Sequence, residues 1–158
     1  MAKEIERKYL IDLARWQKPA NGIKIMQCYL VRSENMTLRL RLADDKAFLT
    51  IKGRTSGISR SEFEYVIPRQ DALEMLKEFP VSASVCKTRY YEQIGSHRWE
   101  VDVFEGANAG LAVAEIELAD ADEKFELPAW VLQEVSNDKR YRNAYLADHP
   151  YSQWQGDN

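Results

Sequence analysis

The sequence predicts a mainly β protein with flanking helices (α+β), in which eight antiparallel strands close into one barrel with a charged interior. Two observations lead to this prediction. Short segments alternate apolar and charged residues with a period of two, which places alternate side chains on opposite faces of a strand. Turn signals separate eight such strands, and closure removes the edges that an open sheet would expose. The length of 158 residues fits a single domain over residues 1–158.

The elements follow in chain order from local signals. The expected strands cover residues 3–10, 23–32, 36–43, 46–53, 61–67, 84–93, 97–105 and 112–120. A short helical turn after Asp12 ends at Pro19, which lacks an amide hydrogen. A helix over residues 71–79 is predicted by the spacing of its apolar residues, and residues 130–145 are expected to be helical and loop-like.

Charges of one sign recur at alternate positions of these strands. Such neighbours lie about 6.7 Å apart on one face and repel each other unless opposite charge lies between them. The acidic members are Glu4, Glu6, Glu62, Glu64, Glu100, Asp102, Glu115 and Glu117, and the basic members are Lys8, Arg39, Arg41, Lys52, Lys87 and Arg89. If all of them face the interior, these eight acidic and six basic groups give it a net charge of −2. The pattern predicts a site for cations and anions together.

The alternative is an open sheet with one face in water, as antiparallel sheets often have. A solvated face usually mixes its signs, whereas whole strands here carry one sign. Long charged side chains cannot fill a dry core, because desolvation is costly, so we expect a wet interior. The apolar residues between them then point outward, where helices around Leu73 and Tyr145 cover them.

Composition excludes several other functions. A net charge of −3 argues against broad binding of nucleic acid or anionic membranes. The N-terminus lacks an apolar signal region and no segment reaches the length of a membrane span, so we expect a cytoplasmic protein. Cys28 and Cys86 fit reduced thiols, and His97 and His149 are too few for a zinc site or a catalytic triad.

The ordered motifs resemble those of a known family. Glu4-Ile5-Glu6-Arg7-Lys8 is similar to the ExExK signature of the CYTH superfamily, the triphosphate tunnel metalloenzymes. The resemblance continues, in the family's order, through Thr37 to Arg41, Thr50 to Lys52, Glu62 to Glu64, Lys87 to Tyr90, Glu100 to Asp102, Glu115 to Glu117 and Glu134 to Asn143. It implies an eight-stranded tunnel that binds a triphosphate with one or two divalent cations, Mg²⁺ or Mn²⁺.

The resemblance, with ion chemistry, assigns a role to each charged residue. Carboxylates suit Mg²⁺, so the eight acidic residues are the candidate metal ligands, with Glu4, Glu6, Glu115 and Glu117 first. The six basic residues and Lys139 are expected to bind phosphate oxygens. The expected catalytic set is Glu4, Glu6, Lys8, Lys87, Glu115 and Glu117. Tyr29 resembles a tunnel-lining tyrosine of related bacterial proteins, although packing is the simpler role.

Three functions stay open at this point. The short single-domain form resembles inorganic tripolyphosphatases, which hydrolyse tripolyphosphate. A class IV adenylate cyclase or a thiamine triphosphatase would share the same strand residues. A non-catalytic polyphosphate-binding module is the alternative from another class, but eight carboxylates would weaken its binding unless metals were held. A small polyanion is the expected partner in each case, and the chain could form a homodimer.

Overall fold

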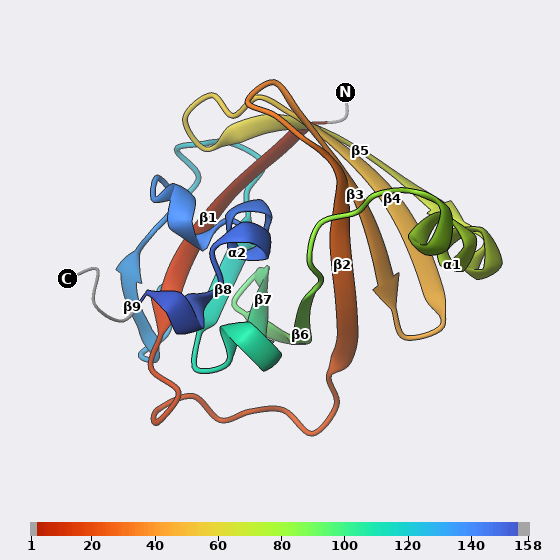
Figure 1. The fold of residues 1–158 in the computed structure, drawn as a ribbon. Helices are drawn as coiled ribbons and strands as arrows, with labels where there is room; N and C mark the ends of the chain where they lie inside the picture. The colour runs from red at the N-terminus through yellow and green to blue at the C-terminus, as the bar shows by residue number, and fades with distance from the viewer. Residues whose placement is uncertain (1–2, 155–158) are drawn as a thin grey trace.

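The computed structural model describes residues 3–154, which form a closed antiparallel barrel with one additional strand (Figure 1). The strands are β1 (Lys3–Ile11), β2 (Ile23–Arg32), β3 (Met36–Ala43), β4 (Lys46–Gly53), β5 (Ser59–Ile67), β6 (Val85–Ile94), β7 (His97–Phe104), β8 (Ala112–Glu117) and β9 (Val131–Glu134). They are ordered β5-β4-β3-β2-β6-β7-β8-β1-β9, and pairing of β5 with β1 closes the barrel. The predicted fold class and its eight strands are confirmed.

The C-terminal region differs from the prediction. Residues 131–134 form β9, which pairs with β1, where helical and loop-like structure was expected. Its two apolar residues are followed by two polar ones, so the segment does not alternate and gives no strand signal. The helices are α1 (Arg69–Glu78) and α2 (Asn143–Asp148), with short 3-10 segments η1 (Gly106–Asn108), η2 (Lys139–Tyr141) and η3 (Tyr151–Gln153). No helix within residues 3–154 is long and apolar enough to cross a membrane.

Apolar side chains cover most of the outer surface of the barrel, as expected. One cluster combines Trp99 and Ile116 of the strands with Trp16 and Trp130 of the flanking loops. A second cluster packs Leu40 of β3 against Ala72 of α1, with Leu73 beside it. Burying these groups drives closure of the barrel, because each large apolar side chain contributes about 1.5–3 kcal/mol when fully buried.

The helix that contains Tyr145 does not cover the outside, so that prediction is wrong. Leu146 of α2 packs with Val85, Phe104 and Val113, which share the inward face of their strands with charged residues two or more positions away. This apolar cluster fills one part of the barrel interior, which we call the closed end. The helix packs inside because the inward residues here are apolar, whereas the outer surface is already covered.

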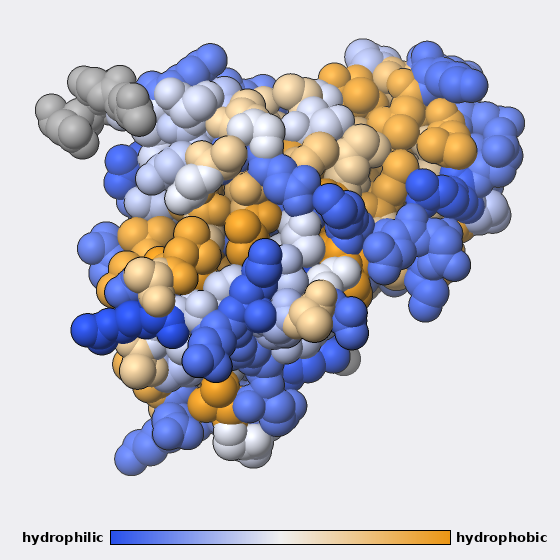
Figure 2. Space-filling view, turned by 90° about the horizontal axis from the view of Figure 1, so that it is seen from below, coloured by the Kyte–Doolittle hydropathy of each residue, from blue (hydrophilic) through white to orange (hydrophobic). Residues whose placement is uncertain are grey.

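The wall of the barrel is uneven around β5. This strand pairs with β1 only over three residue pairs, from Lys3↔Ser61 to Ile5↔Ser59. Beyond that point the side chains of Phe63, Tyr65 and Val66 are exposed. A space-filling view from below shows apolar surface on the side of the molecule where α1 lies (Figure 2). The barrel is therefore tightly covered around β7 and β8 and less covered around β5.

Candidate functional site

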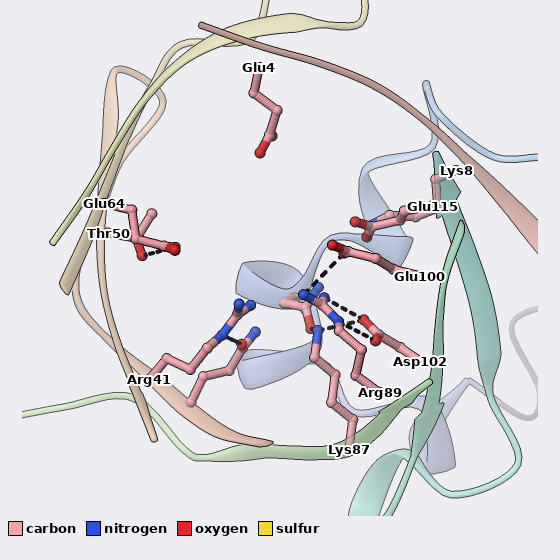
Figure 3. Close-up of polar contacts among 12 residues, drawn as sticks. Glu4, Lys8, Arg41, Thr50, Glu64, Lys87, Arg89, Glu100, Asp102 and Glu115 are labelled. Carbon is pink, nitrogen blue, oxygen red and sulfur yellow. Dashed lines mark hydrogen bonds and ion pairs between the residues drawn. The ribbon is translucent and has the colours of Figure 1, made fainter. Parts of the chain in front are cut away.

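The barrel encloses a cavity of about 1050 Å³. Charged side chains from opposite strands point into it, with Glu4, Glu64, Arg41 and Glu115 on different sides (Figure 3). The predicted residues that line it are Glu4, Glu6, Lys8, Arg39, Arg41, Lys52, Glu62, Glu64, Lys87, Arg89, Glu100, Glu115, Glu117 and Lys139. Alternation along the strands brings these distant segments together, because each inward position follows the last by two residues. Asp102 is the predicted site residue that does not line the cavity.

Carboxylates from β1 and β8 gather on one side, which we call the acidic wall: Glu4, Glu6, Glu115 and Glu117. Glu6 lies opposite Glu117 in the strand register, and Lys8 lies opposite Glu115. Burial raises the pKa of Glu4 to about 7, although Lys52 acts in the other direction. Burial, together with the charges of Glu115 and Glu4, raises the pKa of Glu6 well above its usual range. The wall therefore resists full ionisation without an added cation.

Two lysines compensate part of this charge. Lys8 Nζ lies 3.2 Å from Glu115 Oε1, and Lys52 Nζ lies 3.2 Å from both Glu4 Oε1 and Glu62 Oε2. Burial alone would raise the pKa of Glu115, but the charge of Lys8 lowers it to about 2. Within residues 3–154, Glu6 and Glu117 have no cationic group within 4.0 Å. Among the described residues, Glu6 and Glu117 are therefore the members of the acidic wall that form no ion pair.

Asp102 lies behind the cavity, between two of its cations. Its carboxylate accepts hydrogen bonds from Arg89 Nε at 2.8 Å and Arg89 Nη2 at 3.0 Å, and Lys87 Nζ lies 2.7 Å from Oδ2. Burial would raise the pKa of Asp102, but Arg89 and Lys87 hold it well below its usual range. Both carboxylate oxygens are engaged in a fully buried cluster, so Asp102 is the counter-ion of Lys87 and Arg89, and its role as a metal ligand stays a prediction.

Lys87 and Arg89 differ in how strongly they hold their protons. Burial lowers the pKa of Lys87 to about 7, and Lys87 Nζ also donates to Asn143 Oδ1 of α2 at 3.1 Å. Burial would also lower the pKa of Arg89, but Asp102 raises it well above its usual range. Arg89 Nη1 lies 3.0 Å from Glu100 Oε2. Arg89 is therefore a fixed cation, whereas Lys87 can change its charge near neutral pH.

On β3, two arginines have different partners. Arg39 Nη2 donates to Thr50 Oγ1 at 3.1 Å and lies 3.4 Å from Glu64 Oε2. Arg41 Nε donates to Gln27 Oε1 at 2.9 Å, and no carboxylate of residues 3–154 lies within ion-pairing distance of its guanidinium. Burial and the charges of Arg39 and Arg89 lower the pKa of Arg41 to about 9. We call Arg39, Arg41, Lys87 and Arg89 the basic wall.

The cavity is also lined by cations that the charge pattern did not identify. They include Arg54, Arg60 and Arg142. Among residues 3–154, twelve Lys and Arg side chains line the cavity against ten Asp and Glu. The lining therefore carries more positive than negative groups, in contrast to the net charge of −2 that the fourteen predicted residues gave. Arg60 could have been found, because it shares its strand face with Glu62 and Glu64 at a spacing of two. Arg54 and Arg142 lie in loops and carry no periodic signal.

The acidic wall has the chemistry to hold a divalent cation. Its side chains offer carboxylate oxygens, which Mg²⁺ prefers, and a bound cation would offset the burial and the repulsion that together raise the pKa values of Glu4 and Glu6. Within residues 3–154, no three His, Cys, Asp or Glu side chains are already arranged as a metal site.

The fold and the cavity together define a class of protein: a closed antiparallel barrel whose cavity is lined by both acidic and basic side chains. The chain belongs to the CYTH domain family, whose model matches residues 2–147. An inorganic triphosphatase of Acetivibrio thermocellus is 39% identical over 155 residues, covering 98% of this chain and 99% of the relative. An inorganic triphosphatase of Nitrosomonas europaea is 35% identical over 148 residues, covering 91% and 96%.

Solved structures show the same fold. A crystal structure of an inorganic triphosphatase matches with a TM-score of 0.64 and 31% identity, covering 90% of this chain and 96% of that one. A putative adenylate cyclase from Bacillus halodurans matches with a TM-score of 0.61 and 16% identity, covering 77% and 84%. The second likeness concerns the fold alone.

Proposed function

We propose that this chain is a divalent-metal-dependent inorganic triphosphatase that hydrolyses tripolyphosphate inside the tunnel. The observation that carries the proposal is the presence, in one cavity, of an acidic wall that is only partly neutralised and a basic wall whose Arg41 has no carboxylate partner among residues 3–154. The first wall suits a cation and the second suits an anion. The two relatives named inorganic triphosphatase support tripolyphosphate as that anion.

The residues of the chain would act mainly by positioning and by charge. Phosphoryl transfer needs little covalent chemistry from the protein, so no Ser, Cys or His nucleophile is required. Arg39, Arg41 and Arg89 would hold phosphate oxygens as planar forks, and Lys8, Lys52 and Lys87 as point charges. Glu4, Glu6, Glu115 and Glu117 would hold one or two Mg²⁺ or Mn²⁺ ions, with Glu62, Glu64 and Glu100 supporting them. Such an ion supplies charge neutralisation and lowers the pKa of an attacking water.

Lys87 is the candidate for moving a proton at the basic wall. Its pKa of about 7 allows both charge states near neutral pH, which general acid catalysis requires. Lys87 Nζ lies 3.1 Å from Asn143 Oδ1 of α2 and 2.7 Å from Asp102 Oδ2 of β7, so two different elements fix its position. A proton on Nζ would neutralise charge that develops on the departing phosphate oxygen.

A phosphate-release assay tests the function. The purified protein would be given tripolyphosphate, pyrophosphate, ATP and thiamine triphosphate in turn, with Mg²⁺ and with excess chelator. We expect release from tripolyphosphate with Mg²⁺ to exceed release from every other substrate. Efficient formation of cyclic AMP would favour a class IV adenylate cyclase, preference for thiamine triphosphate would favour a thiamine triphosphatase, and binding without turnover would favour a polyphosphate-binding module. The cytoplasmic location and the homodimer stay predictions.

A further inference from the structure

Gln27 is a fully buried polar residue beside the cavity that the charge pattern did not include. Its Oε1 accepts the hydrogen bond from Arg41 Nε at 2.9 Å, which fixes the orientation of the amide, because an arginine nitrogen can only donate. Its Nε2 has no hydrogen-bond partner among residues 3–154. A buried N–H without a partner costs about 1–3 kcal/mol, so this arrangement calls for an explanation.

A glutamate at this position would have nearly the same shape as Gln27 and would avoid the unpaired N–H. It would also place a carboxylate against Arg41, as Asp102 is placed against Arg89 at 2.8 Å. Arg89 and Lys87 both have such a counter-ion, whereas Arg41 has a neutral acceptor in the same relation to its Nε. The neutral amide therefore orients Arg41 without neutralising it.

The location of this pair indicates which part of an anion it meets. Gln27 lies opposite Val85 in the strand register, and Val85 belongs to the apolar cluster with Leu146 that fills the closed end. Arg41 lines the cavity, and its Nε is taken up by Gln27. The two terminal nitrogens of Arg41 then carry its remaining donors, which suit a bidentate contact with phosphate oxygens.

We propose that Gln27 is a positioning residue that aims an uncompensated Arg41 at the innermost phosphate group of the substrate, next to the closed end of the cavity. This proposal rests on the proposed function for the identity of the anion. It adds a neutral residue to the determinants of substrate binding, and it explains why an amide and not a carboxylate occupies position 27. The neutral amide leaves the charge of Arg41 free for the substrate, and the unpaired N–H of Gln27 is the cost of this arrangement.

The test replaces Gln27 by Glu, which keeps the acceptor for Arg41 Nε and adds a counter-ion. Tripolyphosphate would be titrated calorimetrically into the metal-free protein in chelator, and KM and kcat would be measured with Mg²⁺. We expect Gln27→Glu to weaken tripolyphosphate binding at least about tenfold and to raise KM more than it lowers kcat, since the innermost contact is lost. Its thermal midpoint should equal or exceed that of the wild type, because the new ion pair forms in the empty protein.

Two further variants keep the test decisive. Gln133→Glu adds the same charge on the exposed strand β9 and should leave binding unchanged. Gln27→Met keeps the length of the side chain without the acceptor, and it should weaken binding several-fold because Arg41 is no longer oriented. Wild-type affinity in Gln27→Glu, or equal weakening by Gln133→Glu, would overturn the proposal. If tripolyphosphate binds but is not hydrolysed, the proposed function fails while the titration still decides the role of Gln27.

Discussion

The acidic and basic walls of the tunnel solve the same electrostatic problem in different ways. In the acidic wall, like charges lie opposite each other, as Glu6 and Glu117 do, and the pKa values of Glu4 and Glu6 rise. In the basic wall, one buried carboxylate, Asp102, compensates both Lys87 and Arg89. Within residues 3–154, lysines pair with only part of the acidic wall, whereas the cations of the basic wall have carboxylate partners except at Arg41.

The two walls therefore contribute to function in different ways. A group of carboxylates held partly protonated is an incomplete cation site, because a bound cation lowers their pKa values and restores their charge. A group of cations held by an internal counter-ion is already ordered, so little rearrangement is needed when an anion arrives. We therefore expect the acidic wall to change its ionisation when it binds a cation, whereas in the basic wall Arg89 keeps its charge and Lys87 is the group that can change protonation.

Removal of divalent cations should have the largest effect. Without a cation the carboxylates of Glu6 and Glu117 face the anionic substrate without neutralisation. We expect phosphate release from tripolyphosphate to fall to the uncatalysed background in excess chelator and to return when Mg²⁺ or Mn²⁺ is restored. Undiminished turnover in chelator would show that the acidic wall does not hold a catalytic metal.

Loss of the internal counter-ion should be the next largest effect. Asp102→Asn leaves Arg89 and Lys87 buried without their carboxylate, and breaking a buried ion pair of this kind costs about 3–5 kcal/mol. The free energy of unfolding, measured with denaturant, should fall by that amount. Asp122→Asn removes an exposed carboxylate from a loop and serves as the control. A change no larger than that of the control would contradict the role of Asp102.

Glu4→Gln should separate stability from activity. The folded pKa of Glu4 is about 7 against an ordinary value of 4.5, so the folded protein holds more protons than the unfolded one between these values. The stability of the metal-free protein therefore falls as pH rises from 4.5 to 7, and the penalty persists above pH 7. A glutamine cannot ionise, so Glu4→Gln should be more stable than the wild type at pH 8 by about 3 kcal/mol, since each pKa unit corresponds to about 1.4 kcal/mol.

The same substitution should lower turnover strongly at saturating Mg²⁺, because it removes a charge that binds the metal. Glu126→Gln, an exposed carboxylate outside the cavity, is the matched control and should change neither property. The measurements are denaturant unfolding in chelator at pH 5 and pH 8, and phosphate release with Mg²⁺. Full activity of Glu4→Gln would remove Glu4 from the proposed metal ligands.

Substrate preference should be the smallest of these effects. The cations that line the cavity are numerous enough to contact every phosphate of a linear triphosphate, and the binding residues proposed above are all assigned to phosphate and none to a base. We expect kcat/KM for tripolyphosphate to exceed that for ATP more than tenfold, which corresponds to about 1.4 kcal/mol. Arg39→Ala should reduce the use of both substrates, since both present phosphates to it. Equal kcat/KM values would indicate a recognition element for the nucleoside.

Most of the fold could be predicted from the sequence, because a spacing of two identifies strands and their inward residues. The bounds of β2, β3 and β4 agree with the prediction to the residue. The role of Asp102 could not be predicted, since a metal ligand and a buried counter-ion give the same alternating pattern. Gln27 and Arg142 were missed for a different reason. One is uncharged and the other lies outside the strands, so only the folded chain brings them to Arg41 and the cavity.

We expect the acidic wall to bind the divalent cation and the basic wall to bind tripolyphosphate, each without the other ligand present. Calorimetric titration of wild type, Glu4→Gln and Arg41→Ala tests it most directly, with Mn²⁺ alone in one series and tripolyphosphate in chelator in the other, so that no turnover occurs. We predict that Glu4→Gln loses affinity for Mn²⁺ and keeps affinity for tripolyphosphate, and that Arg41→Ala does the reverse. If each variant weakens the binding of Mn²⁺ and of tripolyphosphate equally, the two walls are not separate binding sites.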